Sequence, residues 1–575
     1  MKHIDNIGKK HAWLFCLLLL LFLEWLSFRN MYGTEQLFGD LGDGRLTNLI
    51  TEHWYRFFRG EASFADLGIF YPAQNTLAYS DMFLGFGIIH SLFRFLGMDM
   101  YLAFKCTILL VHLLGTIASF YLLRRVLRVR TVWAVFGTAA FSFSDSYITG
   151  LLHTQLASLS FLPVTFILII RFVQNFENRK KRNVYGCLSI LMLAVILYSA
   201  WYTAFFLAFS FFTFLLVGLA AVLILRIRPG KYLKKWILTL KWDLLGYLLL
   251  GAALITPFIL LELPVMNMSG GYMFEEISER YLPGLAGLIH VSSGNWMLGE
   301  WISRTSWFAG KDHEIIRGFS IVLLLTFVCT FIRHIVRTHR LSPRNGKHID
   351  FRSILCTVIS VSTVLDILFM IRWPGTSFSL WEGVFLYFPG GKSIRSVGRY
   401  MLFLSFPLSM ITAYMAGAEH FSSAPSSSAT IKRSFISTIP ETVLLVLLIL
   451  SNLNIVSIKP EGMVSPWNRK DALERMAQVA QPPEDCKIFY LSDPSSDQIL
   501  PLLQTEACEI AYAKNLKTIN GYSGLTPEGW GDLWDIRGEN YQKAAYNWIF
   551  DHDIRNVYGY DQIDNLWYFA EIGPE

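Results

Sequence analysis

The chain has 575 residues, of which 53% are hydrophobic, 15% are aromatic and only 16% are charged. A chain of this composition must bury most of its length in lipid or against other apolar helices, which excludes an ordinary soluble enzyme. The net charge of +6 does not indicate nucleic-acid binding, because the lysines and arginines fall in one set of loops between apolar segments. Composition therefore predicts a polytopic membrane protein.

The first apolar segment covers residues 12–31 and follows two lysines, Lys9 and Lys10. At about 1.5 Å per residue, a helix of this length crosses a bilayer. The segment shows no small-residue cleavage site, so we expect an uncleaved first span with a cytoplasmic N-terminus.

Directly after this span, the stretch FGDLGDGRLTNLITEHW places two aspartates, an arginine, a glutamate and a histidine beside the membrane. Charge is costly there unless it serves a function. Asp40 and Asp43 are separated by a glycine-containing turn that can direct both carboxylates into one cavity. Asp43 also has the position of a helix N-cap, and apolar residues recur after it with helical spacing up to Gly60. The pattern predicts an interfacial helix that lies on the bilayer.

The segment 79–97 is apolar but carries Asp81, His90 and Arg94. If it crossed the membrane, the arginines of 124–130 would lie outside, against the positive-inside rule. If it lies at the interface instead, every later basic loop falls on the inner side. These loops cover 124–130, 179–182, 226–241 and 333–352. We therefore predict that 79–97 is a second interfacial segment.

Eleven spans follow from this assignment. They are expected at 12–31, 101–123, 131–149, 154–172, 184–200, 202–225, 243–261, 316–333, 354–372, 400–418 and 440–458. Because the number is odd, the C-terminal tail is expected on the outer side. The long outer loops are then 33–100, 262–315 and 373–398, and such loops are where chemistry usually collects.

After residue 458 the composition changes to that of a small soluble domain, in which the strings KIFYL and NVYGY predict strands. The predicted fold class is therefore an all-α polytopic membrane bundle, 1–458, followed by a small α/β extracytoplasmic domain, 459–575. In an oxidising compartment, Cys486 and Cys508 either form a disulfide or stay as free thiols, since the sequence does not give their separation.

Several strings carry a resemblance to a known family. They are GDLGDGR with EHW, FYP and YSD within 70–81, FPGGKSIRSVGRY at 388–400 and NGYSG at 520–524. With the order of spans, outer loops and C-terminal domain, they make the chain resemble a bacterial group within the GT-C superfamily of integral membrane glycosyltransferases. The resemblance implies transfer of a sugar from a polyprenyl-phosphate donor to a glycan, lipid or protein acceptor in the cell envelope, on the outer face of the bacterial plasma membrane. It also implies that the catalytic base lies in the first outer loop.

An inverting transfer needs a general base for the acceptor hydroxyl and a positive group for the departing phosphate. Asp43 or Asp40 fits the first role, and spacing does not decide between them. Arg395 and Arg399 fit the second role, because they are one helical turn apart at the outer start of a span and follow a glycine-rich turn. Interfacial snorkelling is the structural alternative for the two arginines.

Five further residues are candidates for substrate binding. They are Arg45, Glu52, His53, Asp81 and His153. Arg45 and Glu52 have a structural alternative as partners on the polar face of the interfacial helix, and His53 either packs against the span or lines the site. Asp81 and His153 can bind sugar hydroxyls or a divalent cation, and the sequence does not decide whether a metal is required.

Other classes of enzyme lack their motifs, since there is no P-loop, no GxGxxG after a strand, no HExxH and no nucleophile elbow. The competing hypothesis is a transporter or flippase of lipid-linked saccharides, which predicts charged residues within several spans and repeats between the halves. Only Glu24 and Asp366 stand out inside the spans, and no repeat is evident. In a third hypothesis, a structural assembly factor, the acidic loop is dispensable. The prediction is therefore a glycosyltransferase that uses membrane lipid and no nucleic acid.

Overall fold

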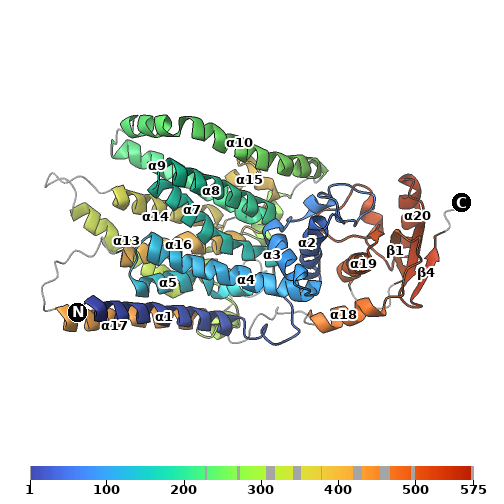
Figure 1. The fold of residues 1–575 in the computed structure, drawn as a ribbon, viewed down its shortest axis with the longest axis horizontal. Coiled ribbons are helices and arrows are strands. Elements are labelled where there is room, and N and C mark those ends of the chain that lie inside the picture. Colours follow the sequence, from blue (N-terminus) through green and yellow to red (C-terminus); the bar gives the residue numbers. More distant parts are fainter. Residues whose placement is uncertain are drawn as a thin grey trace.

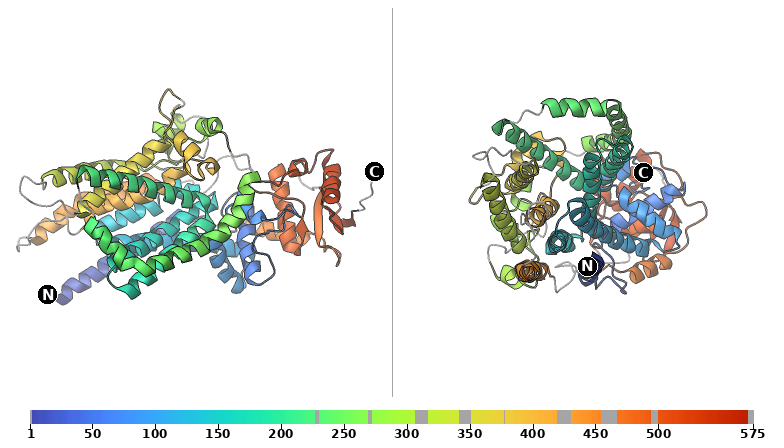
Figure 2. Two further views of the ribbon diagram at one scale, coloured as in Figure 1. Left: turned by 90° about the horizontal axis from the view of Figure 1, so that it is seen from above. Right: turned by 60° about the vertical axis from the view of Figure 1, so that its left-hand side comes forward.

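The structure is a computed structural model of the chain. It describes residues 2–226, 230–268, 272–305, 317–340, 351–376, 378–418, 430–453, 467–493 and 499–570. Most of its helices run side by side along the long axis of the molecule (Figure 1). The N-terminus lies at one end of this bundle and the C-terminal domain lies at the other (Figure 1 and the left view of Figure 2).

Each of the eleven predicted spans overlaps a helix of the structure. These helices are α1 (Lys2–Ser27), α4 (Met100–Tyr121), α5 (Thr131–Ser142), α7 (Leu162–Gln174), α8 (Arg179–Ser199), α9 (Trp201–Ile224), α10 (Gly230–Met268, kinked at Lys241), α13 (Ile321–Arg340), α14 (Phe351–Met370), α16 (Arg399–Gly417) and α17 (Thr430–Asn452). Within the described residues, 8 stretches are long and apolar enough to cross a membrane. They are Met100–Val126, Thr154–Gln174, Arg179–Ser199, Trp201–Ile224, Leu238–Met266, Ile321–His339, Phe351–Met370 and Arg399–Gly417. The apolar stretches in α1 and α17, Leu14–Ser27 and Pro440–Asn452, are shorter.

The prediction of one continuous helix at 131–149 is wrong. Helix α5 ends early, and a separate short helix, α6 (Asp145–Gly150), follows it. Ser144 begins α6, because its Oγ accepts a hydrogen bond from the backbone N–H of Tyr147 at 3.3 Å. A polar capping residue thus interrupts what reads in the sequence as one apolar run.

Two helices cover the end of the bundle that faces the C-terminal domain. Helices α2 (Asp43–Phe58) and α3 (Leu84–Phe95) pack against each other, and α2 lies across the direction of the bundle helices (Figure 1). With 12 residues, α3 is too short to cross a hydrocarbon core of about 30 Å. The structure therefore agrees with the interfacial assignment of both segments.

Short helices connect these elements. They are η1 (Thr76–Tyr79), η2 (Leu122–Val126), η3 (Thr154–Phe161), α11 (Phe274–Arg280), η4 (Leu285–Ile289), α12 (Gly299–Arg304), α15 (Trp381–Tyr387) and η7 (Gly391–Ser393).

The C-terminal domain is a small mixed α/β unit. Its elements are α18 (Arg469–Gln478), β1 (Ile488–Asp493), α19 (Leu500–Lys514), β2 (Lys517–Thr518), η9 (Trp530–Leu533), α20 (Tyr541–Asp551), β3 (Val557–Asp561) and β4 (Leu566–Phe569). The sheet has the order β2-β1-β3-β4, with β1 parallel to β2 and β3, and β3 antiparallel to β4. The predicted fold class, a helical membrane bundle with a small α/β domain, is therefore confirmed. Cys486 and Cys508 are buried free thiols in this domain.

Backbone hydrogen bonds attach this domain to the first outer loop. The N–H of Thr518 donates to the carbonyl oxygen of Gly68 at 2.9 Å, and the N–H of Tyr71 donates to the carbonyl oxygen of Thr518 at 2.9 Å. A third bond of 2.9 Å joins the N–H of Phe70 to the carbonyl oxygen of Asn520. Residues 68–71 thus extend the edge of the sheet, and they fix the domain against the end of the bundle that carries α2.

Candidate active site

The acidic turn before α2 gives its two aspartates different environments. Oδ1 of Asp40 accepts hydrogen bonds from the backbone N–H groups of Gly42 at 2.9 Å and Gly44 at 3.2 Å. The prediction that Asp43 is the helix N-cap is therefore wrong, because Asp40 satisfies the first amides of α2 and Gly42 has the N-cap position. Gly39 has φ +84°, and a Cβ on it would lie 2.6 Å from Cα of Gly44, so the turn requires glycine there.

The side chain of Asp43 is 39% exposed and contacts residues outside α2. Its Oδ1 accepts a hydrogen bond from the phenol of Tyr522 at 2.9 Å, and its Oδ2 lies 3.4 Å from Nδ1 of His153. Burial alone would raise the pKa of Asp43, but His153, Tyr522 and the guanidinium of Arg399 together hold it below its ordinary value. Asp43 is therefore ionised at neutral pH.

Asp40 differs in the direction of its pKa shift as well as in its contacts. Burial, followed by the neighbouring charge of Asp43, raises the pKa of Asp40 above its ordinary value, although the two amides oppose this. Of the two aspartates, Asp43 is the more acidic, and its carboxylate is not engaged in capping α2. The structure thus shows that Asp40 and Asp43 have different environments, which their spacing in the sequence could not show.

The glycine-rich turn before α16 is supported by the start of α9. Gly390 has φ +82°, and a Cβ there would lie 2.6 Å from the indole of Trp201. The indole N–H of Trp201 donates to Oγ of Ser393 at 2.6 Å. The backbone N–H of Arg395 donates to the phenol oxygen of Tyr202 at 3.0 Å. These contacts fix the turn that carries both predicted arginines.

The two arginines lie among aromatic rings. The guanidinium of Arg399 is 5.2 Å from the ring centroid of Tyr202, and Arg399 is only 7% exposed. The guanidinium of Arg395 is 5.4 Å from the ring centroids of both Tyr272 and Tyr281. Such contacts hold planar cations in place.

Electrostatic coupling connects the arginines to the aspartates. The charge of Arg399 lowers the pKa of both Asp43 and Asp81, and the charge of Arg395 acts on Tyr522. The structure therefore brings Arg399 to the same end of the bundle as Asp43, although one follows the first span and the other begins α16.

Asp81 lies beside this group but has a backbone partner. Its Oδ1 accepts the N–H of Trp201, the first residue of α9, at 2.6 Å. Burial raises the pKa of Asp81 to about 6, although the bond from Trp201 and the charge of Arg399 oppose this. Asp81 thus anchors the start of α9.

Two predicted substrate-binding residues of α2, Arg45 and Glu52, have structural partners instead. Arg45 is fully buried, and its Nε lies 3.5 Å from the carboxylate of Glu509 in α19. The carboxylate of Glu52 contacts His90 at 3.0 Å and Arg94 at 2.8 Å, both in α3. These pairs hold α2 between α3 and the C-terminal domain rather than line the site of Asp43.

His53 is also buried in α2 and does not titrate near neutral pH. Burial and the nearby charge of Arg56 lower its pKa to about 4. Its ring packs edge-on against Trp54, with 6.0 Å between the centroids. Of the two possibilities that the sequence left open for His53, the packing role therefore describes its environment.

Metal ligands do not cluster in the described part of the chain. There, no group of three or more His, Cys, Asp or Glu side chains is arranged to hold a metal ion. The divalent cation that the sequence left open at Asp81 or His153 stays a prediction.

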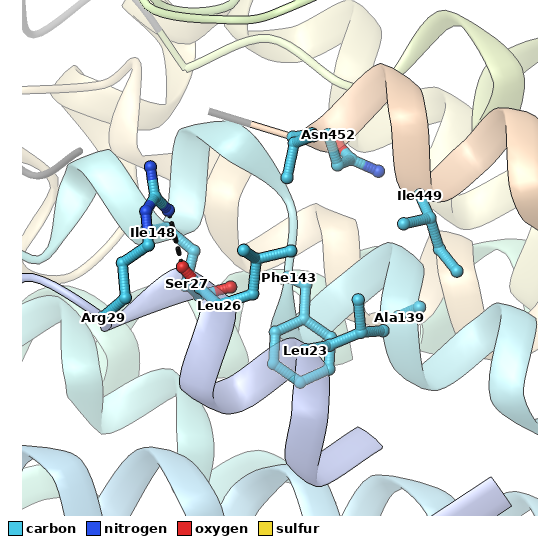
Figure 3. Close-up of a pocket in the computed structure, with 10 residues that line it drawn as sticks. Leu23, Leu26, Ser27, Arg29, Ala139, Phe143, Ile148, Ile449 and Asn452 are labelled. Carbon is cyan, nitrogen blue, oxygen red and sulfur yellow. Dashed lines mark hydrogen bonds between the residues drawn. The ribbon is translucent and has the colours of Figure 1, made fainter. Parts of the chain in front are cut away.

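A separate pocket lies between α1, α5, α6 and α17, away from the aspartates. Its lining is Leu23, Leu26, Ser27, Arg29, Ala139, Phe143, Ile148, Ile449, Asn452 and Leu453 (Figure 3). Arg29 donates to the carbonyl oxygen of Leu26 at 2.6 Å, so it caps α1. The pocket is mostly apolar and contains none of the candidate catalytic residues.

Tyr522 is the site residue that sequence reasoning missed. It belongs to the C-terminal domain, 479 residues beyond Asp43, and no spacing rule connects the two. The only signal was the string NGYSG, which contributed to the resemblance without a role of its own.

The fold and the site define a multi-pass helical membrane protein that gathers an ionised carboxylate, a histidine and arginines beside its C-terminal domain. No known family model matches the sequence, and a search among curated proteins found no match. Among solved structures, the chain is similar to the Archaeoglobus fulgidus oligosaccharyltransferase tethered to an acceptor peptide, at 9% identity and a TM-score of 0.45, covering 95% of this chain and 68% of that one.

Two further solved structures are similar to the chain. One is ArnT from Cupriavidus metallidurans bound to undecaprenyl phosphate, at 11% identity and a TM-score of 0.44, covering 88% of this chain and 85% of that one. The other is the arabinofuranosyltransferase AftD from Mycobacteria, at 15% identity and a TM-score of 0.40, covering 85% of this chain and 30% of that one. The function proposed below rests on the geometry of the site rather than on these similarities.

Proposed function

We propose that the chain is a membrane glycosyltransferase of the GT-C superfamily, which transfers a sugar from a polyprenyl-phosphate-linked donor to an acceptor hydroxyl. The observation that carries this proposal is the placement of the Asp43 carboxylate, which accepts a hydrogen bond from Tyr522 at 2.9 Å and lies 3.4 Å from His153, while the charge of Arg399 helps to lower its pKa. An ionised, partly exposed carboxylate and a buried guanidinium are the two groups that inverting displacement of a phosphate requires.

Asp43 acts as the general base. The acceptor oxygen forms a bond to the anomeric carbon while the bond from that carbon to the phosphate oxygen breaks. The hydroxyl proton passes to Asp43, and the negative charge passes to the polyprenyl phosphate. Asp40 holds the turn through its bonds to Gly42 and Gly44 and takes no proton in this scheme.

Arg399 and Arg395 receive the phosphate. Arginine forks suit phosphate oxygens, and the aromatic rings around both residues fix their planes before the donor binds. Because both residues lie at or just before the start of α16, a lipid carrier can keep its chain in the bilayer while its phosphate reaches them.

The arrangement of the bundle supports a site on the outer face, with the N-terminus in the cytoplasm, in the bacterial plasma membrane that the resemblance implies. The N-terminus, the end of α9, the start of α10 and the end of α13 lie at one end of the bundle, whereas α2 and the C-terminal domain lie at the other (Figure 1). The ends of α9 and α13 adjoin predicted basic loops, and the positive-inside rule assigns such loops to the cytoplasm.

A transfer assay in membranes tests the proposal. Wild type and Asp43→Asn are supplied with a panel of labelled polyprenyl-phosphate sugars, and expression of both is matched by immunoblot. We expect labelled product from wild type and a loss of about 10²- to 10⁴-fold in Asp43→Asn. Equal product from both variants would exclude Asp43 as the base.

The transporter or flippase hypothesis is favoured by one observation. Inside the bundle, Nδ1 of His112 lies 2.9 Å from both carboxylate oxygens of Glu24, and Asp366 is only 1% exposed. Buried ionisable groups within spans often mark transport paths. Movement of a labelled lipid-linked sugar between leaflets, with no product of transfer and with Asp43→Asn fully active, would favour that hypothesis.

A further inference from the structure

The loop after β2 reaches from the C-terminal domain into the proposed active site. At its tip, the phenol of Tyr522 donates to Oδ1 of Asp43 at 2.9 Å. We infer that Tyr522 is a positioning residue for Asp43, so that the C-terminal domain is an integral part of the active site. This inference rests on the proposed function of Asp43 and assigns a role to a residue outside the membrane module.

The two contacts to Asp43 are made to different oxygens of its carboxylate. Tyr522 occupies Oδ1 at 2.9 Å, and His153 lies 3.4 Å from Oδ2. An ionised carboxylate has about four acceptor positions, so two contacts on different oxygens fix its plane and still leave room for an acceptor hydroxyl. The carboxylate is 39% exposed, which is consistent with an approach from outside.

Tyr522 is a permanent donor in this arrangement. Burial, followed by the charges of Asp43 and Asp40, raises its pKa well above the ordinary range for tyrosine. The phenol therefore keeps its proton whenever Asp43 is ionised. Its ring lies nearly parallel to Trp534, with 6.4 Å between centroids and an angle of 24°, and this neighbour restricts where the hydroxyl can point.

The loop that carries Tyr522 is anchored on both sides. Asn520 is fully buried, and its side chain accepts the N–H of Leu491 at 2.8 Å and donates to the phenol of Tyr541 at 2.9 Å. On the other side, Ser523 donates to the carbonyl oxygen of Tyr79 at 2.9 Å. These bonds connect the loop both to the sheet of its own domain and to the first outer loop.

Two glycines allow the close approach of the two segments. A Cβ on Gly521 would lie 2.2 Å from the ring of Phe70, so the loop could not pack there with any side chain. A Cβ on Gly42 would lie 3.1 Å from the phenol oxygen of Tyr522 and 3.5 Å from its Cζ. Replacing Gly42 by alanine therefore crowds the hydroxyl but leaves an ordinary contact to the ring.

The test compares two Tyr→Phe variants of the full chain. Tyr522→Phe removes the donor to Asp43, whereas Tyr558→Phe removes a donor to Asp485, which that phenol contacts at 2.8 Å away from the site. Labelling of Asp43 by a carbodiimide is followed by mass spectrometry as a function of pH, because this reagent attacks the protonated carboxyl group. The midpoint of labelling is expected to move to higher pH in Tyr522→Phe only. An unmoved midpoint would overturn the inference.

Turnover gives the second measurement. We expect kcat to fall about ten- to hundred-fold in Tyr522→Phe with little change in KM for the donor, as for loss of a hydrogen bond to a charged group. Gly42→Ala is expected to lower kcat in the wild-type background and to add little in the Tyr522→Phe background, because the crowded oxygen is then absent. The positioning role would be overturned if Tyr522→Phe kept the wild-type kcat, or if the effects of Gly42→Ala and Tyr522→Phe on kcat were fully additive.

The two measurements separate this inference from the proposed function. Labelling requires no turnover, so it tests the contact between Tyr522 and Asp43 even in a preparation that transfers no sugar. A moved labelling midpoint together with full turnover of Asp43→Asn would exclude Asp43 as the base while retaining the contact. An unmoved midpoint together with inactive Asp43→Asn would exclude the role of Tyr522 while retaining the proposed base.

Discussion

Oδ2 of Asp43 lies 3.4 Å from Nδ1 of His153, although Asp43 begins the interfacial helix α2 and His153 precedes the η3–α7 segment. This pair gives the ionised carboxylate a partner that carries positive charge when protonated. It also links the pH dependence of the site to a residue outside the acidic turn.

His153→Gln is expected to shift the acid side of the pH–rate profile to higher pH. The folded pKa of Asp43 is below its ordinary value of 3.8, so activity is retained above that pKa and lost as pH falls through it. Because His153 helps to lower this pKa, its removal makes the loss begin at higher pH. The profile of kcat/KM for the donor measures the shift, and an unchanged acid limb would contradict the prediction.

Asp40→Asn is expected to retain most activity, in contrast to Asp43→Asn. Asparagine keeps a carbonyl oxygen that can accept the amides of Gly42 and Gly44, so the turn survives. Asp40→Ala removes that acceptor and is expected to destabilise the protein by about 1 kcal/mol. Parallel assays of turnover and thermal unfolding measure both effects, and inactive Asp40→Asn with normal stability would contradict the assignment of the base.

Arg399→Gln is expected to lower kcat/KM by about 10²- to 10³-fold, because it removes charge from the departing phosphate. Lys392→Gln is the control, since Lys392 is an exposed cation on the same turn. If the two variants lost activity equally, general attraction of an anionic lipid would explain the result instead. Initial rates at several donor concentrations distinguish the two cases.

Asp81→Asn is expected to flatten the dependence of stability on pH. The folded pKa of Asp81 is about 6 and its ordinary value is 3.8, so the protonated form is favoured by folding. The stability that this group contributes is complete below about pH 4 and is lost as pH rises through about 6. Thermal unfolding in detergent at a series of pH values should show a smaller decline for Asp81→Asn than for wild type.

Arg45→Met is expected to destabilise the attachment of the C-terminal domain. It leaves the buried carboxylate of Glu509 with one fewer cation, and breaking a buried pair typically costs about 3 to 5 kcal/mol. Arg469→Gln is the matched control, because its pairs with Asp99 and Glu35 are partly exposed and should contribute no more than about 1 kcal/mol. Limited proteolysis and thermal unfolding measure the stability of both variants. Equal destabilisation by Arg45→Met and Arg469→Gln would contradict the prediction.

Hydrophobic patterning predicted the helical bundle well, because long apolar runs and the asymmetry of basic loops are properties of the sequence itself. The α/β character of the C-terminal domain was equally visible in two short strand patterns. The break between α5 and α6 was not, because it depends on capping by Ser144 within an apolar run.

The site was only partly predictable. The chemistry of phosphate displacement nominated Asp43 or Asp40 as the base and Arg395 and Arg399 as phosphate ligands, but the prediction that Asp43 is the helix N-cap was wrong. The backbone N–H groups of Gly42 and Gly44 donate to Asp40 rather than to Asp43, and this pairing depends on the conformation of the turn. The contact with Tyr522 depends on the docking of a whole domain, for which local sequence rules contain no information.

The pairing of residues 68–71 with the edge strand of the C-terminal domain also has a consequence for synthesis on the ribosome. A nascent chain that has inserted all its helices has still not released Tyr522, and its acidic turn has no partner from the last domain. The acidic turn therefore gains its contact with Tyr522 only once the C-terminal domain has been made and has paired with residues 68–71.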